Sequence, residues 1–226
     1  MRLAVLSIVA MLAIAAAGCE VVFPLEDTAP GMFRRPPFNG QVTDDSRLRV
    51  TQPATVQVGD YIVGTLQSAA FSTEIRDLPN GWDKLADFPD GGCDNAQWHT
   101  WVVAGRATEE TTLDFTFENN DTFDALFIPY VDVAAVSSIR NQFPMNSPDA
   151  GTATFPASVS SPGTIMYVSV MANEQTPSDP AGMTRVSAFG NIVAFDQELP
   201  DGELPEVHVE VPANFCLGAS QIKVER

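Results

Sequence analysis

Strict alternation of apolar and polar residues is the feature that most limits the fold of this chain. It is clearest in Leu113-Asp114-Phe115-Thr116-Phe117 and in Val207-His208-Val209-Glu210-Val211. Successive side chains of a β-strand point to opposite faces, so each segment would place three apolar side chains on one face and polar ones on the other. Both segments therefore predict β-strands that cover a core with one face.

Further short runs rich in Val, Ile, Thr and aromatic residues follow from about Thr43 onward, separated by turn residues. They span residues 54–58, 61–68, 97–106, 111–118, 125–133, 152–159, 164–172, 185–189, 192–197, 206–211 and 215–224. No window keeps a helical period with caps, and 17 Pro with 15 Gly also disfavour a helical bundle. We expect residues 43–226 to form one all-β domain, an antiparallel β-sandwich of jelly-roll type.

The composition is that of a folded, acidic protein. Hydrophobic residues make up 45% of the chain, which is too many for a disordered one. Lys and Arg number 12 against 29 Asp and Glu, so the formal net charge is −17. Because phosphate binding needs clustered Lys and Arg, we expect no nucleic-acid partner.

A weak internal repeat suggests that the domain is pseudo-symmetric. Residues 79–88 and 180–189 share the frame Pro-x-Gly-apolar-polar-basic-apolar-x-x-Phe, 180 − 79 = 101 positions apart. Gly59 and Gly163 each precede a hydrophobic strand in the same order. We therefore predict an internal duplication, with chance similarity between β-proteins as the alternative.

The N-terminus has the pattern of a targeting segment. Arg2 is followed by an apolar run over residues 3–17, which suits a signal-peptide core and is shorter than the roughly 20 residues of a spanning helix. The run ends in Ala16-Ala17-Gly18-Cys19, which resembles the bacterial lipobox, where a peptidase cuts just before a lipidated Cys. The alternative is an ordinary secretory signal with an incidental Cys.

The lipobox resemblance implies a signal peptide over residues 1–18 and an acylated Cys19 held in membrane lipid. Glu20 follows this Cys, and in the sorting rule of Gram-negative lipoproteins a residue other than Asp favours the outer membrane. Residues 19–42 are interrupted by several Pro and Gly, and we interpret them as a tether between the lipid and the domain.

Cys93 and Cys216 are the cysteines that remain once Cys19 is acylated. An oxidising envelope favours their pairing, so we predict a disulfide between them. They are 216 − 93 = 123 positions apart, and closing so long a loop would stabilise the fold by about 4–5 kcal/mol in the chain-entropy model. Two separate buried thiols are the alternative.

Acidic loops are the candidate metal sites. Residues 87–95 place Asp87, Asp90, Asp94 and Asn95 close together with two Gly, and residues 118–124 form a similar acidic segment. Oxygen ligands on a flexible loop suit Ca²⁺, the one cofactor that these loops suggest. Solvated turns, in which Asp, Asn and Gly act as turn formers, are the alternative.

Trp98 and Trp101 are three apart on a predicted strand, so their side chains should point to opposite faces. One would fill the core, and the other, if exposed, could stack on a sugar ring. Trp82 in its Pro-x-Gly-Trp turn is expected to plug the core. Neither His99 nor His208 has ligand neighbours in sequence for a zinc site, and we expect His208 to face solvent.

Residues 50–225 also resemble the β-sandwich modules repeated in secreted bacterial and phage-tail-like proteins. The matching positions are Val56, Val58, Gly59-Asp60, Tyr61-Ile62-Val63, Pro79-Asn80-Gly81-Trp82 and the strands at 98–104 and 219–224. These motifs describe a scaffold and transfer no catalytic residue. The resemblance implies an adhesive or structural role, although here the module is a single lipidated copy.

Together these features predict a membrane-anchored lipoprotein whose non-catalytic β-sandwich serves adhesion, binding or envelope structure. Its partners would be membrane lipid, through Cys19, and a glycan or an envelope protein. No nucleophile elbow and no phosphate-binding Gly loop is present in the sequence. The alternatives are a carbohydrate-binding module and, less favoured, a glycoside-active enzyme that uses paired carboxylates.

Overall fold

The computed structural model describes residues 33–69, 73–88, 98–142, 151–172, 177–211 and 217–226, which form strands joined by turns. The strands are β1 (Phe38–Thr51), β2 (Tyr61–Ser68), β3 (Ile75–Asp77), β4 (Trp82–Phe88), β5 (His99–Arg106), β6 (Thr112–Tyr130), β7 (Ala135–Gln142), β8 (Gly151–Phe155), β9 (Ser158–Val159), β10 (Thr164–Ala172), β11 (Thr184–Phe189), β12 (Ile192–Leu199), β13 (Glu203–Leu204), β14 (Val207–Val211) and β15 (Leu217–Glu225). Within the described ranges no helix is long and apolar enough to cross a bilayer. The all-β prediction is confirmed.

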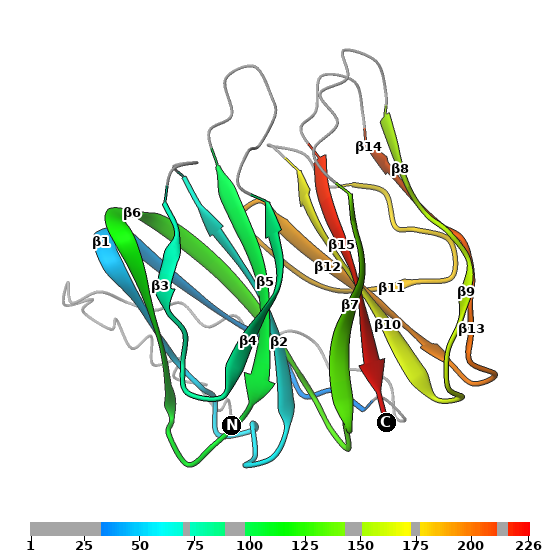
Figure 1. The fold of residues 1–226 in the computed structure, drawn as a ribbon, viewed down its shortest axis with the longest axis horizontal. Coiled ribbons are helices and arrows are strands. Elements are labelled where there is room, and N and C mark those ends of the chain that lie inside the picture. Colours follow the sequence, from blue (N-terminus) through cyan, green and yellow to red (C-terminus); the bar gives the residue numbers. More distant parts are fainter. Residues whose placement is uncertain (1–32, 70–72, 89–97, 143–150, 173–176, 212–216) are drawn as a thin grey trace, which may run out of the picture.

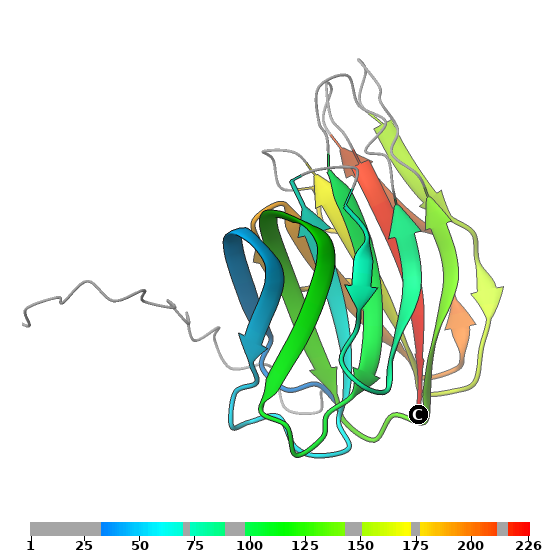
Figure 2. The same ribbon diagram turned by 60° about the vertical axis from the view of Figure 1, so that its left-hand side comes forward.

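Two antiparallel main sheets pack face to face (Figure 1). The first has the order β1-β6-β2-β5-β4, with β3 also paired to β6, and the second has the order β11-β12-β10-β15-β7. Each sheet is therefore built from its own half of the chain. The small pairs β8–β14 and β9–β13 lie on the outer side of the second sheet (Figures 1 and 2). The predicted antiparallel sandwich is confirmed, and its jelly-roll type stays a prediction.

The sandwich core lies between the two main sheets and takes side chains from both. Val102 and Leu126 of the first sheet belong to the same buried cluster as Tyr167 and Ile222 of the second. Burial of apolar surface on this scale is the main favourable term in folding. It also removes the inner face of each sheet from contact with water.

Each main sheet buries its outer face as well. The β1–β6 ribbon bends over the first sheet, so that Phe115 packs with Trp101 and Phe127 (Figure 2). On the second sheet, Phe155 of β8 and Val209 of β14 lie in a separate buried cluster. Strands β2 and β5 are therefore buried along almost their whole length, whereas the covering strands alternate between buried and exposed residues. The alternation over residues 113–117 predicted this covering role correctly.

The prediction of an acidic loop at residues 118–124 is wrong, because these residues lie inside β6. The partner strand β1 shows register shifts between Val42 and Arg47, where Asp44 has a φ of 54°. A bulge lets a pair of strands bend without ending. The acidic residues therefore belong to a bend in one continuous ribbon, and the turn-forming composition of the segment reflects that bend.

The internal repeat falls on equivalent strands of the two main sheets. The orders β1-β6-β2-β5-β4 and β7-β15-β10-β12-β11 match strand for strand. Ahead of β4 and of β11 the fourth residue of a Pro-x-Gly turn donates its N–H to the carbonyl of the first at 3.1 Å, and Gly81 and Gly182 have φ values of 78° and 80°. A type II turn requires this positive φ and so favours Gly. The two halves thus share topology and turn geometry, while an internal duplication stays a prediction.

The folded part begins earlier than Thr43, because residues 33–42 of the expected tether belong to the fold, while residues 19–32 lie outside the described ranges. Arg34 forms a β-bridge with Tyr130, and the Arg35 N–H donates to the carbonyl of Pro129 at 2.9 Å. Strand β1 then begins at Phe38, after two prolines. Proline is tolerated just before an edge strand, so it marks the entry to the sheet here instead of a flexible segment.

Candidate functional site

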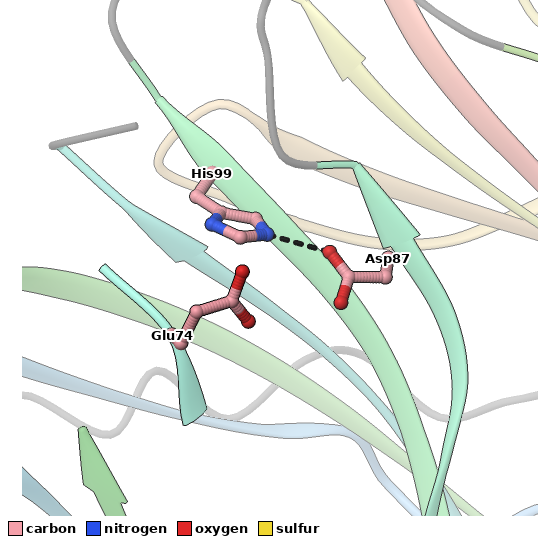
Figure 3. Close-up of side chains that lie close together, drawn as sticks. All are labelled: Glu74, Asp87 and His99. Carbon is pink, nitrogen blue, oxygen red and sulfur yellow. Dashed lines mark hydrogen bonds and ion pairs between the residues drawn. The ribbon is translucent and has the colours of Figure 1, made fainter. Parts of the chain in front are cut away.

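Three strands of the first sheet bring Glu74, Asp87 and His99 together at one end (Figure 3). Glu74 directly precedes β3, Asp87 lies in β4, and His99 is the first residue of β5. In the β4–β5 pairing Asp87 lies opposite Trp101, two residues after His99. Residues two apart on a strand share a face, and a diagonal cross-strand neighbour is within reach of long side chains. The pairing of β4 with β5 therefore directs Asp87 at the imidazole.

The contacts within this cluster are short. The Nε2 atom of His99 lies 2.6 Å from Oδ1 of Asp87, and the ammonium of Lys84 pairs with Oδ2 of the same carboxylate. Lys84 Nζ is also 3.8 Å from Oε2 of Glu74. One ligand atom from each of Glu74, Asp87 and His99 lies within 4.8 Å of the others. Two carboxylates against one ammonium leave the cluster with one excess negative charge when the imidazole is neutral.

His99 is the buried member of the cluster. Its side chain is 1% exposed, and its ring stacks on Trp101 with the centroids 4.1 Å apart. A carboxylate at Nε2 favours the tautomer in which Nε2–H donates to Asp87, so Nδ1 carries a lone pair. Nδ1 is buried and has no hydrogen-bond partner among the described residues. Leaving a buried acceptor unpaired costs about 1–3 kcal/mol.

Asp87 is set up to be a carboxylate. Burial raises the pKa of Asp87, but hydrogen bonds from His99 and Lys84 outweigh it, and the pKa lies below its ordinary value of 3.8. A general acid needs a pKa raised toward the working pH. Asp87 is therefore suited to holding a positive partner and poorly suited to donating a proton.

The exposure of the three side chains limits the chemistry of the cluster. The His99 ring is too buried to act as a general base on a substrate, whereas the carboxylates of Glu74 and Asp87 are half-buried and open to small solutes. Nitrogen from His together with carboxylate oxygen is a common ligand set for Zn²⁺ and related ions. A small cation is thus the species that this arrangement fits.

A separate set of polar side chains crosses the sandwich core and joins the two main sheets. The hydroxyl oxygen of Thr65 in β2 lies 3.0 Å from that of Tyr167 and 2.8 Å from that of Ser169, both in β10. Burial raises the pKa of Tyr167 to about 12, so the phenol is neutral at physiological pH. These groups satisfy one another's hydrogen bonds, and we interpret them as structural.

A buried ion pair also links the sheets. The guanidinium of Arg34 pairs with Asp196 in β12, and the hydroxyl of Tyr130 donates to the same carboxylate at 3.3 Å. The Arg34 and Asp196 side chains are 4% and 8% exposed. Burial raises the pKa of Asp196 despite the opposing effect of Arg34. The pair fastens the N-terminal segment of the fold to both sheets at once.

Trp98 and Trp101 are 8% and 0% exposed, so the condition for sugar stacking, an exposed face on one of them, is not met. They do point to opposite faces of β5, Trp98 into the sandwich core and Trp101 into the outer cluster. Neither offers a face for sugar stacking, since both faces of the first sheet are covered. Trp82 is buried, as predicted for a core plug.

The remaining candidate residues are only partly described. The other members of the predicted Ca²⁺ and cysteine sites lie outside the described residues: Asp90, Asp94, Asn95, Cys19, Cys93 and Cys216. The Ca²⁺ loop and the disulfide therefore stay predictions, although the two Asp87 oxygens already face Lys84 and His99. His208 is exposed, as expected, and its Nε2 lies 2.8 Å from Glu206.

Sequence reasoning missed Glu74 altogether and left His99 without ligands. Asp87 and Glu74 precede His99 by 99 − 87 = 12 and 99 − 74 = 25 positions; Asp87 and His99 belong to different strands, and Glu74 lies just before a third. No local spacing pattern records such a meeting. The available signal was the adjacency of the strands now seen as β4 and β5, which would have paired Asp87 with the start of β5.

Comparison with known proteins adds no relationship. No family model matches the chain, and neither a curated protein nor a solved structure matches it. The functional argument therefore depends on the sequence motifs and on the geometry described above.

Proposed function

We propose that this chain is a lipoprotein of the bacterial envelope, held at a membrane by acylated Cys19, whose β-sandwich serves adhesion, binding or envelope structure without catalysis. The lipobox resemblance supports the anchor, and Glu20 favours the outer membrane. The resemblance to modules of secreted bacterial and phage-tail-like proteins favours the same functional class. The matching topology of the two halves supports an origin of the domain by internal duplication.

The observation that carries the proposal is the junction between the N-terminal segment, residues 33–35, and the two main sheets. Arg34 contributes both a β-bridge to Tyr130 and a buried ion pair to Asp196. The guanidinium of Arg226 also lies over the Phe33 ring, 4.4 Å from its centroid. A pull on this segment would be resisted by backbone hydrogen bonds and by a charge pair that is costly to break. Such a junction suits a domain that works while attached to a surface.

The junction and the Glu74-Asp87-His99 cluster lie at opposite ends of the first sheet. Arg34 bridges Tyr130, which pairs with Tyr61, and Tyr61 pairs in turn with Arg106 at the end of β5. His99 is seven residues back along β5, or about 23 Å at the usual rise per residue. An anchored molecule would therefore turn the cluster away from the membrane. Cys19 and Phe33 are 33 − 19 = 14 positions apart, which allows at most about 50 Å of separation from the lipid.

The alternative functions have less support. A carbohydrate-binding module of the expected kind needs an exposed aromatic platform, and the three Trp are buried. A glycosidase needs one carboxylic acid with a raised pKa. In the Glu74–Asp87 pair the pKa of Asp87 is lowered and Lys84 contacts both carboxylates.

Fractionation of cells that express the chain tests the anchor. The wild-type protein should sediment with membranes, and Cys19→Ala should appear in the soluble fraction, because the acyl chains provide the attachment. Cys93→Ala is the matched control that removes a different cysteine and should still sediment. Membrane association of Cys19→Ala would overturn the proposal.

Proteinase added to intact cells should digest a displayed adhesin or binding domain, whereas protection would assign the domain to internal envelope structure.

A further inference from the structure

The imidazole of His99 has an unsatisfied nitrogen in a place where two carboxylates converge. Its side chain is 1% exposed, and Nδ1 has no hydrogen-bond partner in the described part of the chain. Figure 3 shows the carboxylates of Glu74 and Asp87 both directed at this ring. The neutral ring can carry its proton on Nδ1 instead of Nε2, and Nε2 then offers a buried lone pair to a cation that lies between the ring and the carboxylates.

We infer that Glu74, Asp87 and His99 bind one divalent transition-metal ion of the Zn²⁺ class. Imidazole nitrogen with carboxylate oxygen suits Zn²⁺ and its neighbours, whereas Ca²⁺ takes six to eight oxygens. Three protein ligands leave a coordination position for water or for a group of a partner molecule. The site does not depend on the acylated Cys19, so the two proposals can fail separately.

The geometry needs only a small adjustment to accept the ion. Zn²⁺ ligands at about 2.0–2.1 Å from the metal are about 3.3 Å from one another in a tetrahedral site. The contact between His99 Nε2 and Asp87 Oδ1 is 2.6 Å, so these side chains would separate by less than about 1 Å. The Glu74 carboxylate is half-buried and free to turn toward the metal.

Lys84 competes with the metal for the same carboxylates. Its ammonium pairs with Asp87 and lies 3.8 Å from Glu74. With a divalent ion bound, the local charge would change from one excess negative to one excess positive, so the ammonium would move out to solvent. Lys84 is half-exposed on a long side chain, which makes this movement easy. The residue therefore sets how tightly the ion is held.

Isothermal titration of the purified protein with ZnCl₂ tests the site, after alkylation of any free thiol to exclude thiol binding. We expect one ion per chain, and Glu74→Gln should weaken the affinity by at least about tenfold. His208→Gln is the matched control, because His208 is the other histidine and also lies beside a glutamate. It should leave the affinity unchanged. No binding by the wild type, or equal binding by Glu74→Gln, would overturn the inference.

Lys84→Gln provides a test in the opposite direction. Removal of the competing ammonium should tighten Zn²⁺ binding about two- to fivefold, the range expected for a half-exposed charge pair. His99→Gln should abolish binding, with circular dichroism to check that it folds; if it does not fold, the half-exposed Glu74 and Lys84 variants decide. Unchanged affinity in Lys84→Gln would place the ion elsewhere and refute the site. Equal affinity for CaCl₂ would refute the assigned metal class.

Discussion

Removal of the buried Arg34 guanidinium should be the most damaging single change at the junction between the N-terminal segment and the sandwich. Arg34→Ala leaves Asp196 in the core with a weak hydrogen bond from Tyr130 as its described partner. Arg47→Ala is the matched control, since Arg47 also pairs with an aspartate across strands, Asp114. The two pairs differ in burial, with side chains 4% and 8% exposed in the first and 46% and 33% in the second.

The difference in burial sets the expected magnitude. Breaking a buried ion pair from one side costs about 3–5 kcal/mol, because a charge is left without compensation. An exposed pair contributes about 0–1 kcal/mol. For a chain of this size each kcal/mol corresponds to about 2–4 °C in Tm, so Arg34→Ala should lower the Tm by about 6–20 °C and Arg47→Ala by at most about 4 °C.

Urea unfolding and calorimetry of the two variants at pH 7 provide the measurement. The deficit of Arg34→Ala should shrink toward pH 4. Burial raises the pKa of Asp196 above its unfolded value, so the folded state loses stability as the pH rises past that value, and it loses more without Arg34. The variant Arg34→Met with Asp196→Leu should recover most of the loss. Equal destabilisation by Arg34→Ala and Arg47→Ala would refute the reasoning.

Three further predictions follow from other contacts. Gly105→Ala should destabilise the fold by about 1–3 kcal/mol in urea unfolding, because a Cβ there would overlap the Trp82 ring, and Trp82→Leu in the same chain should relieve part of that cost. Tyr167→Phe should cost about 0.5–1.5 kcal/mol, and ultraviolet titration of the wild type should show one tyrosine that ionises only near pH 12; ionisation near pH 10 would contradict its burial. Asp87→Asn should be less stable than the wild type at pH 7, but the gap should close as the pH falls below about 4, since the folded pKa of Asp87 lies below its unfolded value; a gap that persists at pH 2 would contradict the role of the carboxylate.

Features that depend on neighbouring residues were predictable from the sequence. Alternation over residues 113–117 and 207–211 requires only a strand with one covered face, and both segments form covering strands. The Pro-x-Gly turns at Gly81 and Gly182 require only a residue that tolerates a positive φ. The β class, the antiparallel sandwich and the burial of Trp82 follow from such local signals.

Only the tertiary structure decided which strand faces are exposed to solvent and which residues far apart in sequence are in contact. Trp101 is buried because a bent ribbon covers the outer face of the first sheet, and no property of β5 alone indicates that cover. Arg34 pairs with Asp196, which is 162 positions away in the sequence, and the pairing of β4 with β5 brings His99 into contact with Asp87. Local sequence pattern predicted strands such as β2, β5 and β10, but it missed β1 and β4 and placed a strand at residues 54–58, where the structure has none. Sheet pairing joins segments whose separation in sequence carries no information about their contact, so packing decided the sites.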